Sequence, residues 1–156
     1  MSDEHWMLLA IETARRGIEQ GQTPFGACIV RGDDLIVAAH NLVWRTTDVT
    51  AHAEVTAIRE ACRALGAIDL TGCAIYSTCE PCPMCFSACH WARLDRIVFG
   101  ASIADASAAG FNELPISNDQ LKRLANTPIQ LLGGILREKA ADLFHLWLQQ
   151  PTRRGY

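Results

Sequence analysis

The chain has 156 residues, 49% hydrophobic and 20% charged, which is the usual size of one domain that buries a core without disulfide bonds. Its formal net charge of −3 provides no chain-wide excess of Lys and Arg, which counts against a large polyanionic partner such as nucleic acid. No apolar run approaches the roughly 20 residues that cross a bilayer, and the acidic N-terminus is unlike a signal peptide. We therefore expect a single cytoplasmic domain over residues 1–156 with no membrane segment.

The first third of the chain predicts a helix and a hairpin. Apolar residues at helical spacing favour a helix over residues 4–20. Two short apolar runs, 27–30 and 35–39, flank the turn sequence Arg31-Gly-Asp-Asp34 and predict a β-hairpin. A polar loop is expected over 41–50.

The middle of the chain predicts alternating helices and strands. A helical pattern over 52–65 is followed by a buried strand over 73–78, a helix over 81–91 and a strand over 96–100. Gly66 lies just beyond the first of these helices, where a helix commonly ends. Successive strand and helix units favour parallel strand pairing.

The remaining segments complete the expected fold. We predict a short helix over 117–125, a fifth strand over 129–132 and a long closing helix over 135–149, with residues 150–156 as a C-terminal tail. The fold class is then an α/β protein, a three-layer α/β/α sandwich around a five-stranded mixed sheet.

Two short motifs provide the parts of a catalytic zinc site. The first is His52-Ala-Glu54 and the second is Pro81-Cys82-Pro-Met-Cys85. One imidazole and two thiolates make three ligands for Zn²⁺, which leaves a fourth tetrahedral position for water. Both cysteines fall at a predicted helix start, where the positive helix end lowers the pKa of a thiol. Glu54 is placed to accept the proton of that water, so we predict one catalytic zinc ion per chain.

The cysteines also permit two other interpretations. The run Cys79-x-x-Cys82-x-x-Cys85-x-x-x-Cys89 has the spacing of a bacterial ferredoxin cluster, which would make the chain an iron-sulfur electron-transfer protein. However, His90 replaces the proline that should follow, and the His-Ala-Glu motif would have no purpose. A structural zinc module would close the fourth position with another ligand, for which Cys79 is the candidate.

The paired motifs H-x-E and P-C-x-x-C are the signature of zinc-dependent nucleobase deaminases, and the chain resembles the cytidine deaminase-like superfamily. Across nearly its whole length it looks like the small bacterial guanine deaminases of this fold. That resemblance implies conversion of guanine to xanthine and ammonia, and a homodimer whose C-terminal segments could be exchanged. It rests on Thr23-Pro-Phe-Gly-Ala27, Asn41, residues 50–59, residues 79–85, Trp91-Ala-Arg93, Asp105-Ala106 and residues 109–113.

The resemblance implies roles for residues outside the zinc motif. Asn41 would hydrogen-bond the base, and Phe25 and Trp91 would wall the pocket. Glu113 would contact the base and assist proton transfer, although the family commonly has an aspartate pair where this chain has Asn112-Glu113. Tyr156 would cover the bound base, in its own or a neighbouring subunit.

Ordinary structural explanations for these residues stay open. Asn41 could shape the loop after a strand, and large aromatic side chains usually fill core space. Glu113 could be a solvated acid, and chain ends such as Tyr156 commonly fray. We also place Ala53, which separates the two functional residues of the first motif, among the substrate-binding residues.

Other substrates also remain possible at this point. A tRNA adenosine deaminase shares both motifs, but it must hold an anticodon loop, and this chain has only two lysines, Lys122 and Lys139, with dispersed arginines. Cytosine and other aminated heterocycles are further alternatives, because few substitutions change the substrate of a pocket that one or two hydrogen bonds define.

Overall fold

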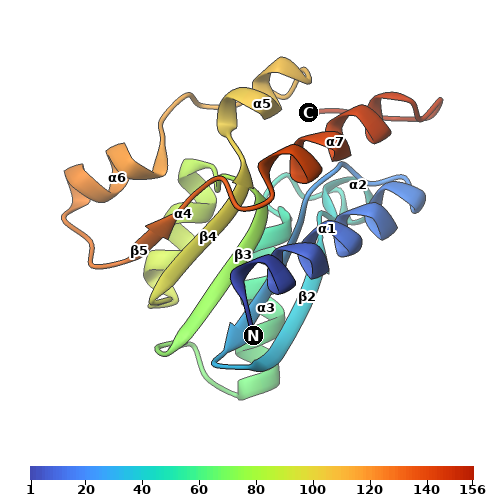
Figure 1. The fold of residues 1–156 in the computed structure, drawn as a ribbon. Helices are drawn as coiled ribbons and strands as arrows, with labels where there is room; N and C mark the ends of the chain where they lie inside the picture. The colour runs from blue at the N-terminus through green and yellow to red at the C-terminus, as the bar shows by residue number, and fades with distance from the viewer.

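The structure is a computed structural model that describes all of residues 1–156, and a five-stranded mixed sheet forms its centre (Figure 1). The strand order is β2-β1-β3-β4-β5. Strand β1 runs antiparallel to β2 and β3, whereas β3, β4 and β5 are parallel. The predicted three-layer fold is confirmed. The strands are β1 (Gly26–Arg31), β2 (Asp34–His40), β3 (Cys73–Cys79), β4 (Arg96–Ala101) and β5 (Gln130–Leu132).

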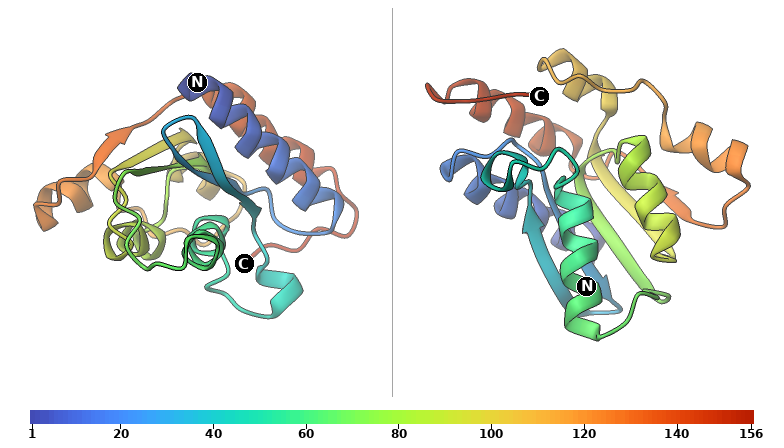
Figure 2. Two further views of the ribbon diagram at one scale, coloured as in Figure 1. Left: turned by 90° about the horizontal axis from the view of Figure 1, so that it is seen from below. Right: turned by 180° about the vertical axis from the view of Figure 1, so that it is seen from behind.

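Helices cover both faces of the sheet (Figure 2). Helices α1 and α7 lie on one face, and α3 and α4 lie side by side on the other. No helix combines the length and the apolar character that a membrane crossing demands. The helices are α1 (Asp3–Glu19), α2 (Val43–Thr46), α3 (Ala53–Leu65), α4 (Pro83–Trp91), α5 (Ile103–Ala108), α6 (Asn118–Ala125) and α7 (Arg137–Leu148).

One edge of the sheet gathers several connecting segments. Strand β1 begins where β2, β3 and β4 end, because Gly26 pairs with His40, and Cys79 pairs with Ala101. The residues just before β1 and just after β2, β3 and β4 therefore meet at this edge. Helices α3 and α4 also begin there, because each starts shortly after the chain reaches this edge.

Close packing fixes the start of β1 beneath helix α1. A Cβ atom on Gly26 would lie 2.4 Å from the carbonyl oxygen of Ala10 and 2.7 Å from the nitrogen of Ala14. Those distances are shorter than van der Waals contact, so only glycine lets the helix backbone approach the strand this closely. The close approach also fixes the position of Phe25, the residue just before β1.

Two short helices were not predicted. Helix α2 lies inside the expected polar loop over 41–50, and its four residues are too few to show helical periodicity. Helix α5 could have been predicted from the sequence, because Ser102 and Asp105 form a capping box at its start. The helix starts of α3 and α4 also differ from the prediction, because His52 and Cys82 are N-cap residues just outside the helices.

An ion pair attaches the first turn of α1 to the sheet. Both carboxylate oxygens of Asp3 accept hydrogen bonds from the Arg96 guanidinium, at 2.7 and 2.8 Å, and the Tyr76 hydroxyl donates to Asp3 at 2.7 Å. The hydrogen bond from Arg96 is the main cause that lowers the pKa of Asp3 below its usual value of 3.8, against the opposing effect of burial.

We predict that Asp3→Asn lowers the free energy of unfolding at pH 7 by about 1 kcal/mol, because the pair is bidentate but partly exposed to solvent. A carboxylate with a lowered folded-state pKa stabilises the protein above its unfolded-state pKa. The difference between the two proteins should therefore shrink as the pH falls from 3.8 through the lower folded-state value. Urea unfolding at several pH values measures it, with Glu4→Gln, an exposed acid of the same turn, as the control. Equal losses for both variants would contradict the prediction.

Candidate active site

Three predicted metal ligands meet at the sheet edge where α3 and α4 begin. The Nδ1 atom of His52 lies 3.7 Å from Sγ of Cys82 and 3.5 Å from Sγ of Cys85. All three ligand atoms lie within 4.8 Å of one another, and no other group of His, Cys, Asp or Glu in the chain has this arrangement. Zinc bonds of about 2.0–2.3 Å in a tetrahedron separate neighbouring ligand atoms by about 3.5 Å, so the three residues fit a zinc ion.

The local sequence explains why both cysteines face the same point. Cys82 is the N-cap of α4 and Cys85 lies in its first turn. Pro83, rather than Pro81, occupies the first helical turn, where its missing N–H group costs no intrahelical hydrogen bond. Unpaired backbone N–H groups at a helix start favour negative charge, which is the form in which a thiolate binds metal.

The electrostatic environment already favours one thiolate. The hydrogen bond from Cys85, with a further one from His52, lowers the pKa of Cys82 to about 4 despite burial. The same hydrogen bond, together with burial, instead raises the pKa of Cys85, whose thiol is the donor. Burial lowers the pKa of His52, but the hydrogen bond with Cys82 and the charges of Glu54 and Cys82 outweigh it and raise the value. A metal that binds here displaces protons from Cys85 and His52.

The other cysteines of the motif point elsewhere. The thiol of Cys79 donates to the carbonyl oxygen of Ser102 at 3.4 Å. Cys89 is fully buried in the apolar cluster beneath α3 and α4. The ferredoxin-type cluster is therefore wrong, because its four cysteines do not converge, and Cys79 is not a fourth ligand of a structural zinc site. The three-ligand arrangement leaves a coordination position for water.

Glu54 lies beside the three ligands and is almost completely buried, with 6% of its surface exposed. Its Oε1 atom accepts a hydrogen bond from the Ser77 hydroxyl at 3.0 Å, and its Oε2 atom lies 3.5 Å from Sγ of Cys85. Burial raises the pKa of Glu54, and the nearby His52 opposes that effect. A carboxylate that is buried and next to a metal site is suited to proton transfer.

A small cavity of about 10 Å³ opens between these residues, which is room for about one water molecule. Glu113 and Phe25 line it from opposite segments of the chain, so both predicted residues reach the site. Burial, together with the negative charge of Cys82, raises the pKa of Glu113 to about 7. The Phe25 ring packs edge-on against Phe111, with ring centres 4.9 Å apart.

The C-terminal tail closes the site from outside. The Asn41 amide nitrogen donates to the Tyr156 hydroxyl at 2.6 Å, and the Tyr156 ring lies 5.5 Å from the His52 ring. Trp44 holds the same tail, because its indole N–H donates to the carbonyl oxygen of Arg154 at 2.8 Å while the Arg154 guanidinium lies over its ring. Asn41 is itself fixed, since its Oδ1 atom accepts from the Val43 backbone N–H at 3.0 Å.

Two further predictions have different outcomes. Trp91 does not wall the pocket of its own chain, because it is the last residue of α4, whereas the ligands lie at the other end, and it is 82% exposed. That prediction is wrong for this pocket. Ala53 begins α3 with its side chain fully buried in the core, so only its backbone N–H, one of the first-turn amides, could contact a substrate.

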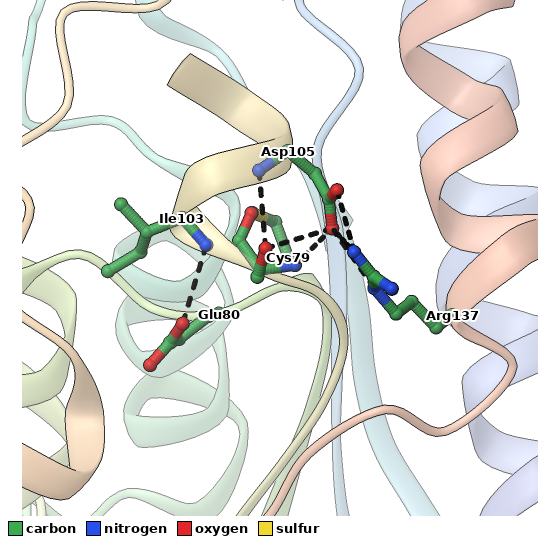
Figure 3. A network of polar contacts seen from close by, with 6 residues as sticks. Cys79, Glu80, Ile103, Asp105 and Arg137 are labelled. Carbon is green, nitrogen blue, oxygen red and sulfur yellow. Dashed lines mark hydrogen bonds and ion pairs between the residues drawn. The ribbon is translucent and has the colours of Figure 1, made fainter. Parts of the chain in front are cut away.

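Sequence reasoning missed the residues that hold the segment before Cys82. Glu80 accepts backbone N–H groups at the starts of two helices, from Ile103 at 3.3 Å and from Asn118 at 2.8 Å. The Asn118 amide in turn donates to the carbonyl oxygen of Pro81 at 2.6 Å. Figure 3 shows Glu80 beside the α5 start, and the Asp105–Arg137 ion pair that joins α5 to α7. The sequence shows the capping residues of these helices, but it does not show their contacts with Glu80 and Pro81, because those residues are distant along the chain.

The chain matches the cytidine and deoxycytidylate deaminase zinc-binding region over residues 1–101. It belongs to this deaminase family. The matched segment includes His52, Glu54, Cys82 and Cys85, which confirms the predicted family and its zinc cofactor, and the three clustered side chains are placed to bind that ion.

Individual relatives point to two kinds of substrate. The guanine deaminase of Bacillus subtilis is 45% identical over 157 residues, which covers 100% of both chains. The tRNA-specific adenosine deaminase of the same organism is 34% identical and covers 97% of this chain and 92% of its own. The solved guanine deaminase from Nitrosomonas europaea superposes with a TM-score of 0.85 at 30% identity, covering 94% of this chain and 84% of its own.

We predict that Cys82→Ala reduces bound zinc from about one ion per chain to near zero, because two remaining ligands hold the metal weakly. Cys79→Ala is the matched control: it removes a neighbouring buried thiol that donates to Ser102 and lies outside the ligand group, so it should keep about one zinc ion. Metal analysis of the purified proteins by mass spectrometry measures both. Loss of zinc from the Cys79 variant would show that the ligand set is wrong.

Proposed function

We propose that this protein is a guanine deaminase, which hydrolyses guanine to xanthine and ammonia. The observation that carries the proposal is the buried carboxylate of Glu54 beside a metal site with three protein ligands. Hydrolysis at an amidine-like carbon requires a nucleophilic water and a group that moves protons. The full-length identity of 45% to a guanine deaminase supports guanine as the substrate.

Glu54 performs the proton transfers in this mechanism. His52, Cys82 and Cys85 would hold the zinc ion, which would supply a nucleophilic water near neutral pH by lowering the pKa of that water. Glu54 accepts the proton of the attacking water and delivers it to a ring nitrogen next to C2. It then assists the departure of the amino group as ammonia. Burial supports both directions of transfer, because it brings the pKa of Glu54 closer to neutrality.

Three further residues would orient the planar base. The Asn41 amide is buried at the site and can hydrogen-bond a ring edge once the Tyr156 hydroxyl releases it. Glu113 faces the same cavity, and a pKa near 7 lets its carboxyl group accept or donate a hydrogen bond. Phe25 provides an apolar wall against which a purine can pack.

The 34% identity to a tRNA-specific adenosine deaminase favours a second candidate, deamination of adenosine in an anticodon loop. Phosphate contacts require clustered Lys and Arg side chains, whereas the chain has a net charge of −3. The free base is therefore the better-supported substrate.

We also propose a cytoplasmic location. All seven cysteines are free thiols, and two of them are zinc ligands. A reducing compartment preserves this state, whereas an oxidising one favours disulfides.

Glu54→Gln tests the mechanism, because it keeps the shape of the side chain but cannot accept a proton. We expect zinc content to stay at about one ion per chain while ammonia release from guanine falls by about 10³-fold. A screen of guanine, adenine, cytosine, guanosine and a tRNA anticodon hairpin fixes the substrate by the same ammonia assay. If only the hairpin releases ammonia, the protein is a tRNA adenosine deaminase and not a guanine deaminase. Near-normal activity of the Glu54→Gln variant would show that Glu54 does not transfer the protons.

We further propose that the protein is a homodimer with exchanged C-terminal segments, so that Tyr156 of one copy closes the site of the other. The resemblance to the guanine deaminases supports exchange, and a neighbouring tail could make the same contacts with Asn41 and Trp44. Gly134, with a φ of 82°, lies just before α7 and provides a backbone position that can turn either way. The exposed Trp91 ring is consistent with a covered surface in a dimer.

Complementation tests this arrangement. We expect Glu54→Gln and Tyr156→Ala chains to be nearly inactive alone, because one lacks the proton acceptor and the other the closing ring. The two chains are coexpressed with different affinity tags, and mixed dimers are purified through both tags. If the tails are exchanged, the site with Glu54 is closed by Tyr156 of the other chain, so one of the two sites is intact and about half of the full activity is expected. The absence of recovered activity in the doubly purified sample would show that each tail serves its own chain. Failure to obtain any doubly tagged protein would contradict the dimer itself.

A further inference from the structure

Ser77 is a polar residue at a core position of the central strand. It pairs with Ala27 of β1 on one side and with Phe99 of β4 on the other, so it lies inside the sheet. The alternation of β3 places Cys73 and Ile75 in the apolar cluster beneath α3 and α4, and Ser77 is the next residue on that face. Its side chain is 1% exposed. A buried hydroxyl costs free energy unless it has a hydrogen-bond partner.

The partner of this hydroxyl is Glu54. The Ser77 Oγ atom donates to Oε1 of the carboxylate at 3.0 Å, which leaves Oε2 on the side of Cys85 and the metal site. A carboxylate on a glutamate side chain can rotate about its terminal torsion. One oxygen held by the sheet therefore fixes the direction in which the other oxygen faces.

We infer that Ser77 is a positioning residue for deamination: its hydroxyl holds the Glu54 carboxylate with one oxygen facing the metal site, where the attacking water gives up its proton. Ser77 itself does not touch the substrate or the metal. This role rests on the proposed function, in which Glu54 transfers the protons. Because the contact lies within one sheet and the helix above it, it does not depend on how the C-terminal tail is arranged.

The test compares Ser77→Thr with Ser77→Val. The two replacement side chains have nearly the same shape, so any effect of packing is shared, and they differ by the hydroxyl group alone. We expect kcat for ammonia release from guanine to be about tenfold lower in the Val variant than in the Thr variant, because a hydrogen bond to a charged group is lost. KM should agree within about twofold, and both variants should hold about one zinc ion per chain.

Two controls separate positioning from a structural effect. Thr78→Val removes the neighbouring hydroxyl of β3, which accepts the Gly26 backbone N–H at 3.1 Å and contacts no functional group of the site. It should lower the unfolding temperature but keep kcat within about twofold. In addition, Ser77→Ala should have no further effect on kcat when Glu54 is already Gln, since the two residues act as one unit.

The possible outcomes are distinct. Equal kcat values for the Thr and Val variants would overturn the role of Ser77 while leaving the proposed function intact. A Val variant that loses zinc, or that raises KM instead of lowering kcat, would also overturn it, because a structural role produces that pattern. If the unaltered protein releases ammonia from none of the bases, the proposed function fails and the positioning role fails with it.

Discussion

The convergence of two helix starts on one point is the constraint on which the rest of the site depends. His52 and Cys82 are separated by 29 residues in the chain, yet both are N-cap residues at the same sheet edge. Neither side chain makes a capping hydrogen bond, so both are available to a metal, while the backbone N–H groups at each helix start favour an anion. The sheet thus brings together an imidazole and two thiols, separated by 3.5 and 3.7 Å. A shift of either helix along its strand by one turn, about 5.4 Å, would separate the ligands.

Burial gives this arrangement its chemical character. Glu54 is 6% exposed and Glu113 is half-buried, so both carboxyl groups have pKa values above those of solvated acids. The same low-polarity surroundings strengthen each remaining hydrogen bond, such as the one from Ser77. A buried acid without such a partner would destabilise the fold. In the proposed mechanism, the residues that support the acid are therefore part of the chemistry even though they never contact the substrate.

The sequence was most informative where function and local structure share one signal. His52, Cys82 and Cys85 were predictable because zinc ligands and helix starts each have characteristic spacing, and the parallel pairing of β3 with β4 followed from the alternation of strands and helices. Trp91 was misplaced because its role came from the resemblance alone, whereas the helix that begins at the ligands ends at Trp91 and carries it away from them. Helix α2 is too short for periodicity to show. Ser77, Glu80 and Asn118 were invisible because their partners come from distant segments, and only three-dimensional pairing identifies them.

In the proposed function, Asn41 would connect closure of the site with recognition of the base. Its amide nitrogen donates to the Tyr156 hydroxyl at 2.6 Å, and the cavity beneath has room for about one water molecule. A purine is far larger than that space, so the tail has to withdraw before a base enters, and withdrawal leaves the buried amide without a partner. An unpaired buried donor is costly, and a base with a complementary acceptor removes that cost. Bases that offer no acceptor at this point leave the amide unpaired, and the tail competes with them. In the proposed function, discrimination among bases would then depend on the Asn41 donor that Tyr156 occupies when the site is closed, in addition to the groups around the metal.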